Sequence, residues 1–344
     1  MHMADALISP AVGGAMWVAT AGLIGYCSKK IKEDIDDRKI PLMGVLGAFI
    51  FAAQMINFTI PVTGSSGHLG GGMILAILLG PYAAFLTMAS VLTVQALFFA
   101  DGGLLALGCN IFNLGFFPCF VAYPLIYKMI VKKRPTAKTL AVGATLSAIV
   151  GLQLGAFFVV LQTVFSGISE LPFSTFVILM QPIHLAIGFV EGVTTAAVVM
   201  FVWKRRPEIL QPVLSSQTDS KSSIQKVLMA FVIATVIVGG GLSWFASAHP
   251  DGLEWAMFKT AGVEELEAPE KGIHSTLATL QEKTAFLPDY GFKKTKMHDS
   301  EEGGQAWPAV DPGTSVSGFV GGMLTLCMAV LIGFIVKRKK AANV

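Results

Sequence analysis

Long apolar stretches, separated by short polar segments, dominate the pattern of residues along this chain. No Asp, Glu, Lys or Arg occurs between Lys39 and Asp101, whereas about 18 consecutive apolar residues are already enough for a membrane-spanning helix. The pattern therefore predicts an all-α, polytopic membrane protein. Its expected spans are 6–27, 41–58, 70–100, 104–127, 139–165, 173–203, 225–247 and 316–336.

The basic residues predict which ends of these spans face the cytoplasm. They gather after four spans, and the positive-inside rule places all four groups inside the cell: Lys29–Lys39, Lys128–Lys138, Lys204–Arg206 and Lys337–Lys340. An even number of crossings must separate the first two groups, so segment 70–100 has to contribute two or none. Gly80-Pro81 near its middle favours a break. We expect two short, tilted helices there, joined by a cytoplasmic turn.

This topology gives seven helices up to residue 206, with the N-terminus outside the cell membrane and the C-terminus in the cytoplasm. Residues 207–224 are polar and predict a cytoplasmic linker. Residues 225–344 predict a separate two-helix hairpin around an external polar insert, 248–315, which holds more than half of the 22 acidic residues. The insert could gather cations, although its composition is more typical of a solvated loop.

Composition and charge exclude several classes of function. The chain is 53% hydrophobic and only 14% charged, and its net charge of +3 is dispersed over helix ends, which argues against nucleic-acid binding. The four cysteines show no CxxC spacing and predict neither a disulfide frame nor a thiolate metal site. The chain has no GxxxxGK[ST] phosphate-binding loop, so it cannot hydrolyse ATP by that route.

The amino terminus, Met1-His2, is the first candidate site. An α-amine has a pKa of about 7.7–8.0 and an imidazole of about 6.5, so both offer a neutral nitrogen near pH 7. With His2 second, the amine, the amide nitrogen and the imidazole can close two fused chelate rings, a nearly planar set that favours Cu(II) or Ni(II). His68, in a glycine-rich stretch on the same predicted face, could supply a fourth nitrogen. The alternative is that His2 is fortuitous and His68 caps a loop.

Two further polar clusters lie in predicted helices. Asp101, Asn110 and Asn113 belong to the run DGGLLALGCNIFN, and His184 and Glu191 lie two turns apart on one helical face. Helix capping and interhelical hydrogen bonds explain these residues best, and support of a metal site is the alternative. The small residues Gly44, Ala48 and Ala52, one turn apart, favour either an internal contact or a docking face for a partner.

Taken together, these motifs resemble the NikM/CbiM family, the substrate-capture membrane component of energy-coupling-factor (ECF) nickel/cobalt transporters. The resemblance covers residues 1 to about 206 and rests on Met1-His2, SSGHLGGG, DGGLLALGCNIFN and HLAIGFVEGVTT in that order. His249 to Glu254 resemble the PDGLE-type (NikN-like) module that accompanies it. The third and fourth residues, Met-Ala, depart from the Ile-Pro of many relatives, so the turn after the chelating pair could differ.

The resemblance implies that the metal is held by Met1, His2 and His68. We regard six further residues as structural or supporting candidates: Ser66, Asp101, Asn110, Asn113, His184 and Glu191. It also implies partners: two cytoplasmic ATP-binding-cassette ATPases and a membrane coupling (T) protein. The ion would be a transported substrate, and no organic cofactor is expected. Planar nitrogen ligation favours Ni(II) over Co(II) without excluding cobalt.

Two other functions fit parts of the sequence. Gly64 to Gly67 match the GxSG pattern of intramembrane serine proteases, with Ser66 as nucleophile and His184 as a base on a later helix. A passive channel or a metal sensor without ATPase partners is the other alternative. Neither accounts for the joint occurrence of the motifs above, and we expect a transport component rather than an enzyme.

Overall fold

The computed structural model describes residues 2–34, 39–132, 135–169, 171–210, 221–269, 271–293 and 307–341. Met1, one of the expected metal ligands, lies outside the described residues. The first part of the chain forms α1 (Pro10–Asp34), α2 (Lys39–Gln54), α3 (Gly72–Leu79), α4 (Pro81–Phe99), a continuous helix made of α5 (Leu107–Ile111), η2 (Phe112–Tyr127) and α6 (Lys128–Val131), then α7 (Ala137–Ser166) and α8 (Phe173–Arg205).

Six helices of the described chain are long and apolar enough to cross a membrane. Two further apolar helices are shorter, Lys39–Gln54 and Ile224–Gly240. The only strands among the described residues are β1 (Phe58–Ile60) and β2 (Ser65–Gly67), which pair antiparallel with Thr59 opposite Ser66. The expectation of an all-α, multi-pass membrane protein is therefore confirmed.

Segment 70–100 breaks where the sequence predicts. The helix ends at Gly80, whose φ of 81° suits glycine, and Pro81 begins α4. Two helices are thus present, as expected, but they are unequal: α4 has 19 residues, whereas α3 has only eight and is about 12 Å long. The backbone before it is non-helical throughout: residues 65–67 form β2 and residues 68–71 have no regular structure. It is largely buried within the protein, which removes its polar groups from lipid.

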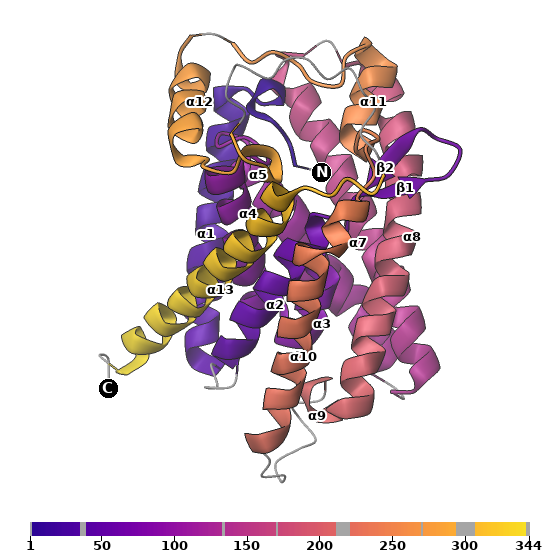
Figure 1. Ribbon diagram of the computed structural model, residues 1–344, viewed down its shortest axis with the longest axis vertical. Coiled ribbons are helices and arrows are strands. Elements are labelled where there is room, and N and C mark those ends of the chain that lie inside the picture. The colour runs from indigo at the N-terminus through magenta and orange to yellow at the C-terminus, as the bar shows by residue number, and fades with distance from the viewer. Residues whose placement is uncertain are drawn as a thin grey trace.

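The second part of the chain begins after the short helix α9 (Pro207–Leu210). It contains α10 (Lys221–Gly240), η3 (Leu242–Phe245), α11 (Gly252–Ala261), α12 (Ile273–Thr284), η4 (Pro288–Tyr290) and α13 (Pro312–Ala341). Helix α13 runs beside α2 and α10 (Figure 1). A Cβ atom on Gly44 would lie 2.6 Å from Cγ2 of Val330, and one on Gly322 would lie 3.9 Å from the Cβ of Ala48. The small-residue stripe of α2 is thus an internal contact in this chain.

The insert between α10 and α13 covers the end of the bundle at which the first residues of the chain lie, whereas α1, α8 and α13 end at the opposite pole (Figure 1). Nε2 of His274 in α12 lies 2.9 Å from the carbonyl oxygen of Ile8. The N–H of Ser66 donates to the carbonyl of Pro250 at 2.8 Å. The interpretation of the insert as a solvated loop is therefore wrong for α11 and α12, which pack on the preceding part of the chain, whereas residues 261–265 are exposed.

Candidate metal centre

The first residues of the chain thread into the bundle as an extended segment. Asn110 of α5 holds Met3 on both sides: Met3 N–H donates to Asn110 Oδ1 at 2.8 Å, and Asn110 Nδ2 donates to the Met3 carbonyl at 3.2 Å. The N–H of Gly103 donates to the same carbonyl at 2.9 Å. Because Met3 is fully buried, these three hydrogen bonds fix the direction in which the chain leaves His2.

The glycines after Asp101 make room for this segment. A Cβ atom on Gly103 would lie 1.9 Å from Oδ1 of Asp5, an oxygen that accepts a hydrogen bond from the N–H of Ala106 at 2.9 Å. Asn113 lies deeper, where its side chain pairs with Gln162 at 2.7 Å and contacts the Met3 sulfur at 3.8 Å. Asn110 therefore holds the backbone of Met3, and Asn113 contacts the side chain of Met3.

His2 and Asp101 face one another. Nδ1 of His2 lies 3.1 Å from Oδ1 of Asp101, and the hydroxyl of Tyr290 donates to the other carboxylate oxygen. Burial raises the pKa of Asp101, but the interaction with His2 and the hydrogen bonds from His2 and Tyr290 lower it by more than burial raises it. The resulting pKa is about 2. Only 8% of the His2 side chain is exposed, and its Nε2 has no hydrogen-bond partner within the described structure.

His68 follows β2 and reaches the same point. The imidazole rings of His2 and His68 stack with centroids 4.9 Å apart and an angle of 4° between their planes. Nδ1 of His68 lies 3.1 Å from the carbonyl of Leu69, which can only accept, so Nε2 carries the lone pair. Burial, and the positive charges nearby, lower the pKa of His68 to about 3. His68 is therefore neutral near pH 7, as a metal ligand must be.

Glu191 of α8 fixes the glycine-rich stretch that follows His68. Its two carboxylate oxygens accept hydrogen bonds from the N–H groups of Gly70 at 3.0 Å and Gly71 at 3.1 Å. A Cβ atom on Gly70 would lie 2.9 Å from Oε2 of Glu191, and Gly71 has a φ of +74°. The glycines thus allow the backbone to approach a buried carboxylate, and Gln54 Nε2 donates to the Gly70 carbonyl at 2.9 Å.

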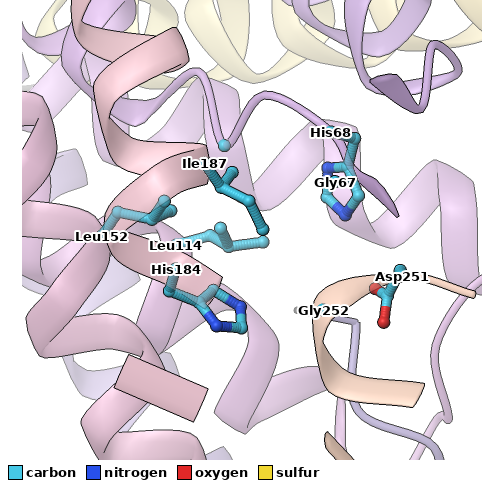
Figure 2. Close-up of a pocket in the computed structure, with 9 residues that line it drawn as sticks. Gly67, His68, Leu114, Leu152, His184, Ile187, Asp251 and Gly252 are labelled. Carbon is cyan, nitrogen blue, oxygen red and sulfur yellow. The ribbon is translucent and has the colours of Figure 1, made fainter. Parts of the chain in front are cut away.

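His184 is the last of the expected site residues. Its Nδ1 lies 2.8 Å from the carbonyl of Met180 in its own helix, and its ring faces a small cavity between α8, α11 and the His68 loop (Figure 2). The cavity has a volume of about 10 Å³, which is close to the room that one water molecule needs. Figure 2 shows His68 and Asp251 on one side of this cavity and His184 across from them.

Asp251 and Tyr290, both in the insert, are residues that the sequence analysis did not assign to the site. Asp251 belongs to the PDGLE run, which the sequence made recognisable without indicating where it would lie. Tyr290 stands in no motif. Ser66 makes a structural contact: its hydroxyl donates a hydrogen bond to the carbonyl of His249 at 2.8 Å, which links the His68 loop to the insert.

The described residues contain no group of three His, Cys, Asp or Glu side chains that could hold a metal ion. Two side chains, His2 and His68, meet at the amino-terminal segment instead. Any complete ligand set there must draw on backbone nitrogens or on Met1, which is not described.

Comparison with known families agrees with this arrangement of the motifs. The family described as the cobalt uptake substrate-specific transmembrane region (CbiM) matches residues 2–209, and the PDGLE domain matches residues 225–338. The chain belongs to the CbiM family. Members of the CbiM family are metal transporters rather than enzymes, so the protease interpretation of Gly64 to Gly67 is wrong.

Relatives of this CbiM-family chain include fused proteins of similar length. The chain is 30% identical over 330 residues to the putative fused nickel transport protein NikMN of Archaeoglobus fulgidus, covering 95% of this chain and 96% of the relative. It is 29% identical to the fused nickel transport protein NikMN of Rhodobacter capsulatus, over 84% and 88% of the two chains. A crystal structure of a truncated transition metal transporter, 29% identical, superimposes with a TM-score of 0.53 over 59% of this chain and 99% of that one.

Proposed function

We propose that this protein captures Ni(II) outside the cell and delivers it inward as the substrate-specific component of an ATP-driven transporter. The proposed ligands are the amine of Met1, the amide nitrogen and imidazole of His2, and the imidazole of His68. The observation that carries the proposal is the stacking of His2 on His68 at 4.9 Å, two imidazoles brought together from separate parts of the chain beside the buried amino-terminal segment.

The surroundings of these residues support a bound cation. His68 is neutral, Asp101 is ionised, and the His2 side chain, which lies against Asp101, is almost wholly buried. Fused chelate rings close through Nδ1 of His2, the atom that Asp101 contacts here. The incoming ion must therefore replace Asp101 on that nitrogen, while Asp101 remains close enough to offset its positive charge.

Nickel is favoured as the substrate over cobalt. Four nitrogens in a plane suit Ni(II) better than Co(II), and the fused relatives of similar length are named as nickel transport proteins. Cobalt uptake by the same mechanism is the alternative, since the family description refers to cobalt and a cobalt transport protein CbiM of Geobacter sulfurreducens is 27% identical over 223 residues.

The proposed partners are two cytoplasmic ATP-binding-cassette ATPases and a membrane coupling protein. The chain lacks a phosphate-binding motif of its own, and its basic clusters favour an outward amino terminus and a cytoplasmic carboxyl terminus. We also propose that the chain divides into a capture domain, residues 1–206, a linker, 207–224, and the PDGLE module, 225–344.

Uptake into sealed vesicles tests this function. Vesicles that contain the chain and its partners should accumulate radioactive Ni(II) only with ATP, and omission of the chain should abolish accumulation. The purified chain, with an untouched amino terminus, should contain about one Ni(II) per molecule. Flux that needs no ATP would support a channel instead, and a chain that binds Co(II) but not Ni(II) would reverse the choice of substrate.

A further inference from the structure

Two cavities of different size meet at Asp251 and His68. The smaller is the inner cavity of about 10 Å³ described above, which His184 also lines. The larger, which we call the vestibule, has a volume of about 600 Å³ and lies between the amino-terminal segment and the insert. His68 and Asp251 are the residues that line both cavities, so these two side chains lie where the vestibule and the inner cavity adjoin.

The vestibule is strongly acidic. Seven acidic side chains line it, Asp101, Glu264 and Glu265 among them, and within the described chain no lysine or arginine does. His2, whose buried Nε2 is unpartnered in the described structure, also lines this space. Such a concave acidic surface raises the local concentration of cations beside the imidazole of His2.

The backbone on both sides of Asp251 fixes its position. Asp251 is the N-cap of α11: its Oδ1 accepts hydrogen bonds from Leu253 N–H at 2.7 Å and Glu254 N–H at 2.9 Å, while the Glu254 carboxylate accepts from Asp251 N–H at 2.8 Å. This reciprocal pair is a capping box. The carbonyl of the preceding residue, Pro250, accepts from Ser66 two residues before His68.

The residue after Asp251 is held equally closely. A Cβ atom on Gly252 would lie 2.9 Å from Cγ2 of Ile183 and 3.2 Å from Cε1 of His184. A glycine at this position therefore lets α11 begin directly against α8, at the wall of the inner cavity. The insert places its carboxylate against the metal centre with a precision that a solvated loop would not provide.

We propose that Asp251 is an oxygen ligand of the metal ion in transit, which holds the ion beside His68 at the wall of the vestibule before the other nitrogen ligands bind it. This inference rests on the proposed function and extends it, because it assigns a direct part in metal capture to the PDGLE module. Carboxylate oxygens are good ligands for hydrated divalent cations, and Asp251 lines the acidic vestibule as well as the inner cavity. A site with only two side-chain ligands binds a metal ion weakly, which suits a site that must pass its ion on to the nitrogen ligands.

The proposal predicts a kinetic effect that differs from general attraction by charge. Asp251→Asn keeps an N-cap for α11 and removes the carboxylate. In the full-length chain with an untouched amino terminus, it should slow Ni(II) association about tenfold, within the range that charge and local cation concentration control. Stopped-flow quenching of tryptophan fluorescence measures the rate, since Trp255 lies in α11 and donates to the Thr63 carbonyl at 3.0 Å. The equilibrium affinity should change less than threefold.

Glu264→Gln is the matched control. It removes the same charge from the vestibule at an exposed residue away from the inner cavity, so its effect on the association rate should disappear in about 1 M salt, where the Debye length is about 3 Å. The effect of Asp251→Asn should persist in that salt. Asp251→Ser also keeps a helix cap and lacks the carboxylate, so it should reproduce the slow association. Thermal unfolding of both Asp251 variants shows whether either has lost stability, which separates slow association from a folding defect.

The outcomes separate this inference from the proposed function. If the unaltered chain binds no Ni(II) at equilibrium, the proposed function fails. If it binds Ni(II), and Asp251→Asn associates as fast as the unaltered chain or loses its effect in salt as Glu264→Gln does, Asp251 is not a ligand in transit and only this inference is overturned.

Discussion

Glu191 and Gly70 lie 121 positions apart and are joined by a hydrogen bond of 3.0 Å from the glycine N–H to a carboxylate oxygen. The second oxygen of Glu191 binds the next N–H, that of Gly71. One buried side chain in the middle of α8 thus replaces the hydrogen bonds that a helix would have given this stretch, and sets where His68 can lie.

Glu191→Gln should therefore weaken Ni(II) binding, although Glu191 is not among the proposed ligands. A glutamine has one acceptor oxygen instead of two, so its NH₂ group would face the backbone N–H of Gly70 or Gly71. The loss of a hydrogen bond to a charged group costs about 1.5–3 kcal/mol. We expect affinity to fall by at least tenfold in titration calorimetry. Thr195→Val is the control, because Thr195 is buried one turn away and its hydroxyl has no partner in the described structure; it should leave affinity unchanged. Equal affinities of all three proteins would contradict this role of Glu191.

Asn110→Leu should release the amino-terminal segment. The variant leaves the buried N–H of Met3 unsatisfied, at a cost of about 1–3 kcal/mol, and Ni(II) affinity should fall because the segment no longer points His2 at His68. Thr20→Val serves for comparison: Thr20 is buried and its hydroxyl donates to the Gly108 carbonyl at 2.8 Å. It should lower thermal stability by a similar amount without loss of affinity. A parallel loss of affinity in Thr20→Val would show that affinity follows stability alone.

One additional residue before Met1 should cripple metal binding. The extension moves the amine away from the amide and imidazole of His2 and changes the sizes of the chelate rings, so the planar set cannot close. Calorimetry on the extended and the native chain should show a loss of at least a hundredfold in Ni(II) affinity. An extended chain that binds Ni(II) as tightly as the native one would refute the proposed ligands. As a control, a variant extended only at its carboxyl terminus should bind Ni(II) with the affinity of the native chain.

The metal-free protein should become less stable as the pH rises from about 5 to 8. Burial, together with the charge of Asp251, raises the pKa of Glu254 from 4.5 to about 7. The folded state therefore holds this proton more tightly than the unfolded state, and its contribution is complete below pH 4.5 and lost as the pH rises through 7. We expect thermal unfolding to occur a few degrees lower at pH 8 than at pH 5.

Glu254→Gln is the test of that assignment, since glutamine keeps an acceptor for the Asp251 N–H and does not titrate. Its unfolding temperature should change less between pH 5 and 8 than that of the unaltered chain. An equal change in the two proteins would attribute the pH dependence to other groups.

Hydropathy and charge were sufficient to predict the membrane helices, because a long apolar run has few alternatives. The break at Gly80 was predictable for the same local reason. The short α3 was not, since nothing in the sequence of residues 65–71 shows that Glu191 and Gln54 would satisfy a buried, non-helical backbone. The meeting of His2 and His68 was foreseen from their common face, and their surroundings now support it.

The positions of Asp251 and Tyr290 beside the candidate site could not be predicted, because they depend on where the insert packs on the bundle. Acidic composition is typical of a solvated loop, and only the contacts of His274 with Ile8 and of Ser66 with Pro250 show the insert packed on the bundle. Long-range placement of this kind leaves no trace in local periodicity.

The contact of α2 with α13 has a consequence for how such proteins can be encoded. Gly44 and Ala48 lie against α13, and Ala52 lies against Gly239 of α10, so the two parts of the chain approach closely over the length of a helix. We therefore expect that two polypeptides divided between residues 207 and 224, and synthesised in one cell, would associate through this packing.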